Sequence, residues 1–314
     1  MALLKFSPVF KDYLWGGNSL KTAYHKDYSG EILAESWELS CHPDGPCIIT
    51  NGNYKGMSFK NYIEIAGKQV LGTNCNEFLE FPILIKFIDA KDNLSIQVHP
   101  SDEYALSHEN QYGKTEMWYV ADCEEDAFLY YGFTKAISNE EFKKRAQNGS
   151  LTEVLNKIYV KKGDVFFIEA GTLHAIGKGI IIAEIQQNSN ITYRVFDYGR
   201  KDINGMKREL HIEKALQVTN FSPRLKHISF VPHLGICKYF TVDKVVLDNK
   251  YMKKFLGEVN GDSFLHILVL EGEGCIEYED GGAFQKGDSM LLTASSGNFE
   301  VSGACELLFT YVSK

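Results

Sequence analysis

Three polar residues, Ser95, Gln97 and His99, alternate with aliphatic residues over positions 94–99. Successive side chains of a β-strand point to opposite faces, so these three would share one face. A carboxamide and an imidazole on one face, beside the turn-forming Pro100, make a pattern that can bind a metal ion. An ordinary half-buried strand also alternates, so this segment alone leaves both interpretations open.

Two later segments favour the metal site. Glu116 begins an aromatic-rich strand, and His174 follows another predicted strand and a glycine turn. With His99 they form a set of two histidines and one carboxylate, and Gln97 is a candidate fourth ligand. These nitrogen and oxygen donors suit one divalent ion per chain, with zinc (Zn2+) as the first expectation and other divalent ions as alternatives. So few protein ligands leave coordination positions open for a substrate, which is typical of catalytic sites.

Lys114 lies two residues before Glu116, so in a strand both side chains point to the same face. Its amine can therefore reach the open side of the metal. A desolvated lysine beside a cation can act as an acid or a base in proton transfer. Binding of a phosphate or a hydroxyl group is the alternative role.

The spacing of these residues resembles the cupin family. Gly163, Gly171 and His174 match its second motif, with Glu169 where proline is usual, while the usual His-x-His of the first motif is here Gln97-Val98-His99. A Gln-x-His-Pro element followed by Lys-x-Glu is similar to a narrower group, the type I phosphomannose isomerases. The resemblance covers most of residues 1 to 220, and its further segments are Tyr13-Leu14-Trp15-Gly16-Gly17, Glu35-Ser36-Trp37-Glu38 and Asn190-Ile191-Thr192-Tyr193-Arg194.

This resemblance implies an aldose-ketose isomerase that interconverts mannose 6-phosphate and fructose 6-phosphate, with a cation stabilising the enediolate. Arg194 matches the arginine of the family's active-site motif, which implies that it clamps the enediolate electrostatically or orients the substrate. Lys86 and Ser95 match positions that line the sugar-phosphate pocket. The family commonly has an aspartate after the serine at Ser189, but this chain has Asn190, which leaves no carboxylate there for proton transfer. Arg194 and Lys114 are therefore the expected catalytic residues.

Strand-like runs dominate the chain and are separated by Gly, Asn and Asp turns. We expect a mainly β fold of two cupin-type jelly-roll β-barrels with a few inserted helices. The predicted strands cover residues 47–49, 82–88, 94–99, 117–121, 165–168, 180–185, 239–246, 264–270, 275–278, 289–292 and 307–312. The predicted helices cover residues 58–66, 139–148 and 212–218.

The strand pattern breaks near residues 221–224, which predicts two domains. Residues 1–225 would form the metal-binding catalytic cupin domain with helical insertions, and residues 226–314 a cupin-like domain. Residues 285–292 echo residues 161–168, but no metal ligands follow them.

His266 and the three tryptophans are expected to have structural rather than catalytic roles. His266 lies alone on an apolar strand, so we expect a hydrogen-bonded core residue there. Core packing is likewise the expectation for Trp15, Trp37 and Trp118, because aromatic side chains dominate the interiors of β-sandwiches, with stacking against a carbohydrate as the alternative.

The composition is that of a soluble globular protein, with 44% hydrophobic and 24% charged residues among 314. No segment is long and apolar enough for a membrane span, and the N-terminus lacks a secretory signal pattern. Seven cysteines without a Cys-x-x-Cys pair indicate reduced thiols and a cytoplasmic location. The net charge of -8 argues against a nucleic-acid partner but not against a small sugar phosphate. A monomer or weak homo-oligomer is expected.

Two other functions remain open from the sequence. An iron-dependent cupin oxygenase could use the same two histidines and one carboxylate, although Gln97 and the Arg194 motif do not support it. A non-catalytic cupin that binds a sugar phosphate is the other alternative, and the replacement at Asn190 keeps it open.

Overall fold

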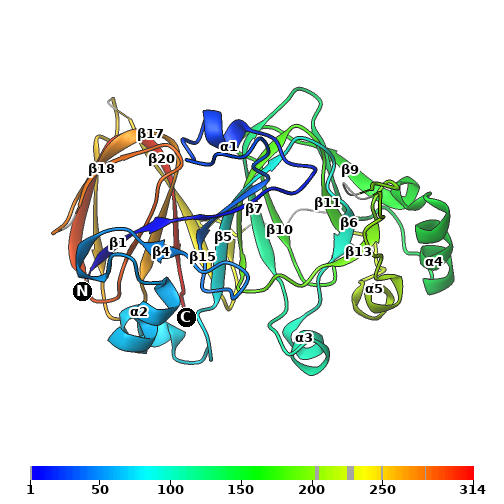
Figure 1. Ribbon diagram of the computed structural model, residues 1–314, viewed down its shortest axis with the longest axis horizontal. Helices are drawn as coiled ribbons and strands as arrows, with labels where there is room; N and C mark the ends of the chain where they lie inside the picture. The colour runs from blue at the N-terminus through cyan, green and yellow to red at the C-terminus, as the bar shows by residue number, and fades with distance from the viewer. Residues whose placement is uncertain (1, 202–204, 225–229, 249, 280) are drawn as a thin grey trace.

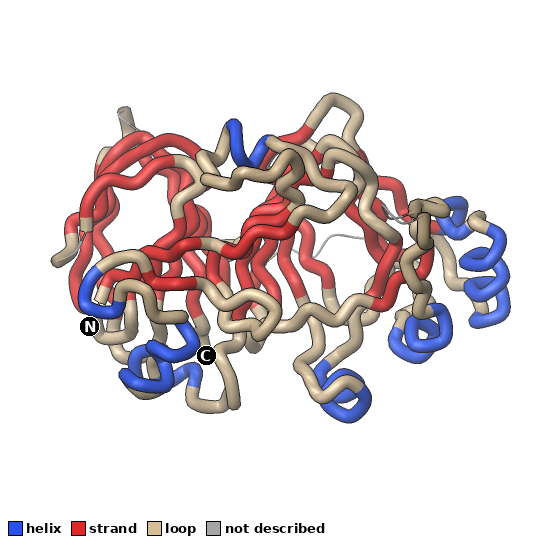
Figure 2. The backbone as a smooth tube through the Cα atoms, in the orientation of Figure 1, coloured by secondary structure: helices blue, strands red, loops and turns tan. Residues whose placement is uncertain are grey.

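Strands provide most of the regular structure and are arranged in three sheets (Figure 1). The computed structural model describes every residue except 1, 202–204, 225–229, 249 and 280. The helices are few and lie outside the sheets (Figure 2). No helix in the described part of the chain is long and apolar enough to cross a bilayer. The predicted mainly β fold is confirmed.

Each sheet has a defined strand order. The nine-stranded sheet runs β14 (Gly235–Ile236), β15 (Thr241–Leu247), β20 (Gly297–Tyr311), β17 (Leu265–Glu277), β19 (Ser289–Leu292), β1 (Leu3–Ser7) and β4 (Ile48–Ile49), with β16 (Lys254–Val259) beside β20 and β18 (Gly282–Gln285) beside β17. The six-stranded sheet runs β10 (Val165–Ile168), β7 (Glu116–Cys123), β12 (Ile180–Gln187), β5 (Ile83–Ala90), β3 (Glu35–Leu39) and β2 (Val9–Lys11). The five-stranded sheet runs β13 (Tyr193–Phe196), β6 (Ile96–Val98), β11 (His174–Ile176), β8 (Phe128–Phe133) and β9 (Leu155–Tyr159).

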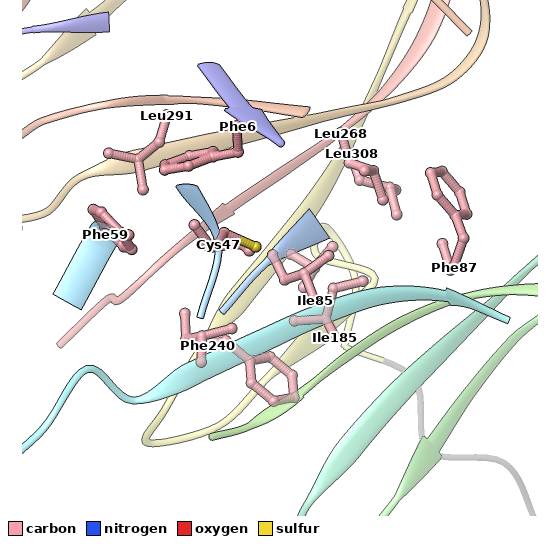
Figure 3. Close-up of a cluster of buried hydrophobic side chains, with 14 of the residues drawn as sticks. Phe6, Cys47, Phe59, Ile85, Phe87, Ile185, Phe240, Leu268, Leu291 and Leu308 are labelled. Carbon is pink, nitrogen blue, oxygen red and sulfur yellow. The ribbon is translucent and has the colours of Figure 1, made fainter. Parts of the chain in front are cut away.

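The buried side chains form layers between these sheets. One face of the six-stranded sheet packs on the nine-stranded sheet, where Phe87 and Ile185 share a cluster with Leu268 and Leu308 (Figure 3). Its other face packs on the five-stranded sheet through a second cluster. Strands β5 and β12 are therefore buried on both faces, which explains their nearly continuous apolar sequences.

All three predicted helices are confirmed. Their observed bounds are α2 (Phe59–Ala66), α4 (Asn139–Asn148) and α5 (Ile212–Val218). The hydroxyls of Ser58 and Ser138 accept hydrogen bonds from backbone N–H groups in the first turns of α2 and α4, as expected for N-caps. Two short helices, α1 (Ser19–Thr22) and α3 (Asp102–His108), were not predicted, nor were the 3-10 turns Gly52–Tyr54, Lys68–Leu71, Thr73–Cys75 and Leu151–Val154.

The C-terminal half differs from the prediction in several respects. Strands β14, β16 and β18 were not predicted, and β20 begins at Gly297, ten residues before the predicted strand 307–312. The two strands predicted over residues 264–270 and 275–278 are a single strand, β17, whose register with β20 shifts between Val269 and Glu271. A β-bulge bends one long strand without ending it. In addition, β1 pairs with β19, so the first strand of the chain belongs to the C-terminal sheet. The predicted boundary at residue 225 lies outside the described residues, and the division into two domains stays a prediction.

Candidate active site

The candidate site lies between the five-stranded and six-stranded sheets. In the five-stranded sheet His174 and Arg194 are each a direct cross-strand partner of Gln97. Directly opposed side chains in an antiparallel pair share a face. Ile96 and Val98 point into the apolar cluster on the other side, so the polar row faces the six-stranded sheet. Strand β6 covers only Ile96–Val98 of the predicted strand 94–99. Leu94 departs from the predicted alternation, because it packs in the cluster between the two sheets rather than with Ile96 and Val98.

The facing sheet presents a second row of functional side chains. Glu184 on β12 is the cross-strand partner of both Trp118 on β7 and Lys86 on β5. Glu116 precedes Trp118 by two residues, so its side chain lies on the same face. Two carboxylates and an amine therefore point towards the histidines.

The predicted histidine and carboxylate ligands come together, fully buried. The Nε2 atom of His174 lies 3.3 Å from Oε1 of Glu116, and Nε2 of His99 lies 3.7 Å from Oε2. One ligand atom from each residue can be chosen so that all lie within 4.8 Å of one another. Within the described residues this is the one such group of three His, Cys, Asp or Glu side chains.

The orientation of both imidazoles suits metal binding. Nδ1 of His99 lies 2.7 Å from the Ile191 carbonyl oxygen, and Nδ1 of His174 lies 2.8 Å from that of Thr172. In each ring Nδ1–H can donate to the carbonyl, which leaves Nε2 with a lone pair for a cation. Burial lowers the pKa of both rings, that of His174 to about 4, so both are neutral as ligands must be.

The ligand atoms themselves lack hydrogen-bond partners. Both Nε2 atoms and both oxygens of Glu116 are buried and make no hydrogen bond to the described residues, although Lys114 Nζ lies 3.0 Å from one of these oxygens. Burial raises the pKa of Glu116. Leaving buried polar atoms unsatisfied is costly, and a divalent cation would give both Nε2 atoms and a Glu116 oxygen a partner. The residues present therefore fit a metal ion.

Two lysines and two carboxylates, Lys86, Lys114, Glu35 and Glu184, lie beside the three candidate metal ligands. Lys86 Nζ lies 3.3 Å from Oε2 of Glu184 and 3.6 Å from Glu35, while Lys114 Nζ lies 4.0 Å from Glu184. Burial alone would raise the pKa of Glu184, but the two lysines outweigh it and lower that pKa. Glu184 is therefore ionised and lies near both amines as a shared counter-charge.

These two lysines and two carboxylates line a pocket of about 270 Å³. Its lining includes all five predicted residues outside the buried triad, namely Lys86, Ser95, Gln97, Lys114 and Arg194. The lining also includes residues for which no catalytic or binding role was predicted, namely Tyr13, Trp15, Glu35, Ile88, Leu94, Trp118, Ile176, Glu184, Asn190, Thr192, Arg208 and His211. The roles of all these residues, and of Gln97 as a fourth ligand, stay predictions.

Some of the missed residues had a recognisable signal. Glu184 is the one charged residue in the strand Ile180–Gln187, and a lone charge in a buried strand points to a partner or a function. Arg208 had no such signal, because it lies in an irregular polar segment.

Other expectations about single residues can be compared with the structure. Trp15, Trp37 and Trp118 are all buried, as core packing requires, but Trp15 and Trp118 also line the pocket. His266 is buried with Nε2 2.8 Å from the Ser289 hydroxyl. Asn190 donates a hydrogen bond to the Asp44 carboxylate over 3.0 Å.

Comparisons with known proteins agree with this geometry. Residues 3–127 match the family model for the catalytic domain of type I phosphomannose isomerase, and residues 232–312 match the cupin domain of mannose-6-phosphate isomerase. The second match supports the predicted cupin architecture.

Individual relatives match almost end to end. The chain is 39% identical to mannose-6-phosphate isomerase ManA of Bacillus subtilis, over 98% of each chain. It is 36% identical to the mannose-6-phosphate isomerase of Streptococcus mutans, over 95% of this chain and 94% of the relative. A crystal structure of mannose 6-phosphate isomerase from Bacillus subtilis superposes with a TM-score of 0.90 at 34% identity, over 99% of this chain and 100% of that one. The chain therefore belongs to the type I mannose-6-phosphate isomerase family.

Proposed function

We propose that this protein is a metal-dependent isomerase that interconverts D-mannose 6-phosphate and D-fructose 6-phosphate. The observation that carries this proposal is the buried set of His99, Glu116 and His174 beside a pocket that contains two lysines and an arginine. Family membership supports the same reaction.

We further propose zinc as the metal, held by His99, Glu116 and His174 with Gln97 as the fourth ligand. Imidazole and carboxylate donors suit zinc. When bound, a divalent ion supplies a Lewis acid that polarises the substrate carbonyl and lowers the barrier to removal of the neighbouring proton.

The chain's own side chains would do the remaining work. Lys114, at the edge of the ligand set, is proposed to move the proton between C2 and C1 of the sugar, with hydroxyl or phosphate binding as its alternative role. Arg194 is proposed to stabilise the negative charge of the enediolate, because its guanidinium lines the pocket beside Gln97. Lys86 and Ser95 are proposed to contact the sugar hydroxyls. A cytoplasmic location and a monomer or weak homo-oligomer stay predictions.

The test is isomerisation of mannose 6-phosphate, followed by NMR on protein of known metal content. We expect turnover that is lost on chelation and regained with Zn2+, and no turnover by Zn2+-treated His99→Ala. Free mannose serves as the substrate control. No turnover by the metal-loaded wild type would contradict the isomerase, and binding without turnover would indicate a sugar-phosphate sensor instead.

A further inference from the structure

The residues that line the active-site pocket form two groups of different charge. In the group beside the metal ligands, the ammonium group of Lys86 lies near the carboxylates of Glu35 and Glu184, and that of Lys114 lies near Glu116 and Glu184. Both lysines therefore already have carboxylate partners, so a dianionic phosphate would gain little from them.

A second group of lining residues has more cations than anions. It includes Arg208 and also Arg194, which is the cross-strand partner of Gln97. The buried carboxylate of Asp197 accepts from Nε and Nη2 of Arg208 over 2.8 and 2.6 Å, and it also lies 3.5 Å from the guanidinium of Arg200. Glu209 adds a second carboxylate, but its side chain is 82% exposed and therefore screened by water. Three guanidinium groups thus share one buried anion.

Some hydrogen-bond donors of these arginines have no acceptor in the described part of the chain. Nε and Nη2 of Arg208 donate hydrogen bonds to Asp197, whereas Nη1 of Arg208 does not. Nε of Arg194 is buried without a hydrogen-bond partner in the described part of the chain. The Arg194 backbone N–H donates to Nδ1 of His211 over 3.2 Å, so the proton of a neutral His211 ring lies on Nε2. Donors without acceptors at the edge of a pocket favour an anionic ligand.

We propose that Arg208, oriented by Asp197, binds the phosphate group of the substrate. This inference rests on the proposed function, because it places C1 and C2 of the sugar at the metal ligands and the 6-phosphate at Arg208. A guanidinium with one edge fixed by a carboxylate is preorganised, so little side-chain entropy is lost when the phosphate binds. Arg208 is then the residue that distinguishes the phosphorylated sugar from free mannose, and Asp197 is a positioning residue.

The experiment compares the metal-loaded wild type with Arg208→Gln, Arg208→Lys and Asp197→Asn. Steady-state isomerisation of mannose 6-phosphate gives KM and kcat, and inorganic phosphate serves as a competitive inhibitor. For Arg208→Gln we expect KM and the inhibition constant of phosphate to rise roughly 10- to 100-fold, as for the loss of a hydrogen bond to a charged group. Arg208→Lys should restore part of both, and Asp197→Asn should raise both less strongly.

Arg145→Gln is the matched control. Arg145 also pairs with two carboxylates, Glu141 and Glu153, but it lies on α4 outside the pocket lining. Its KM and phosphate inhibition should equal those of the wild type. Circular dichroism of each variant shows whether it has folded, and Arg208→Lys tests the site if Arg208→Gln does not fold.

Calorimetric titration of the wild type and Arg208 variants with inorganic phosphate separates this inference from the proposed function. Phosphate binding that depends on Arg208, in a protein without isomerase activity, would support the anion site and remove the isomerase assignment. Isomerisation with unchanged KM and unchanged phosphate affinity in the folded Arg208 variants would overturn the inference and leave the isomerase intact.

Discussion

Gln97 and Arg194 are direct cross-strand partners on β6 and β13. This pairing places a candidate metal ligand and the candidate enediolate clamp side by side on one sheet face. Residues almost one hundred positions apart in the chain are thereby fixed by backbone hydrogen bonds rather than by flexible loops. Preorganisation of this kind is what electrostatic stabilisation of a transition state requires.

His99→Ala is expected to abolish metal retention and turnover. The substitution removes one of two imidazole ligands and leaves Glu116 and His174 with an incomplete coordination sphere. Metal content after dialysis, measured by inductively coupled plasma mass spectrometry, checks the result. The control is His108→Ala, which changes an exposed histidine on α3 and should retain one metal ion per chain. Full metal content in folded His99→Ala would exclude this residue as a ligand.

Glu184→Gln is expected to lower the free energy of unfolding by about 3 kcal/mol, as for a buried ion pair that loses one partner. The substitution leaves the buried amine of Lys86 with only the more distant carboxylate of Glu35 and removes a neighbour of Lys114. Urea unfolding, followed by fluorescence, measures the change. Glu258→Gln, which alters an exposed carboxylate on β16, should change stability little. Equal stabilities of the two variants would show that the lysines need no buried counter-charge.

The proximity of the three candidate metal ligands could be predicted because local patterns carry the information. Alternation over residues 95–99 identifies the shared face, and the glycine turn before His174 marks the end of a strand. The structure brings these segments together with Glu116 as the patterns require. Helices α2 and α4 were equally predictable, since each begins at a serine N-cap.

The pairing of Arg208 with Asp197 could not be predicted from such patterns. The two residues lie 11 positions apart, outside the named helices and strands, and no periodicity relates their positions. The placement of β1 in the C-terminal sheet is likewise a long-range pairing, with Leu4 opposite Leu291. Each of the two strands has a sequence that could pair with many other strands, so the sequence does not specify this partner. Tertiary packing decides both features.

His266 should make stability depend on pH. Burial lowers the pKa of this ring to about 3, whereas an unfolded histidine titrates near 6.5. Between these values the unfolded chain binds a proton that the folded chain does not, so stability falls as the pH drops from about 6.5 towards 3. His266→Gln keeps a donor for the Ser289 hydroxyl but cannot titrate, so its stability should fall less steeply over this window. Urea unfolding of both proteins at several pH values checks this, and parallel pH profiles would disprove it.

Lys114→Met separates the two roles of Lys114. The substitution keeps most of the side-chain volume but removes the amine that lies 3.0 Å from Glu116. If Lys114 transfers the proton, kcat should fall by roughly 10²- to 10⁴-fold while the metal is retained, because this is the usual contribution of a positioned acid or base. Steady-state kinetics and metal analysis of the same preparation check both parts. Lys143→Met, on the surface of α4, controls for the loss of a positive charge and should leave kcat unchanged. A rise in KM at constant kcat would instead assign Lys114 to substrate binding, since uniform binding affects KM alone.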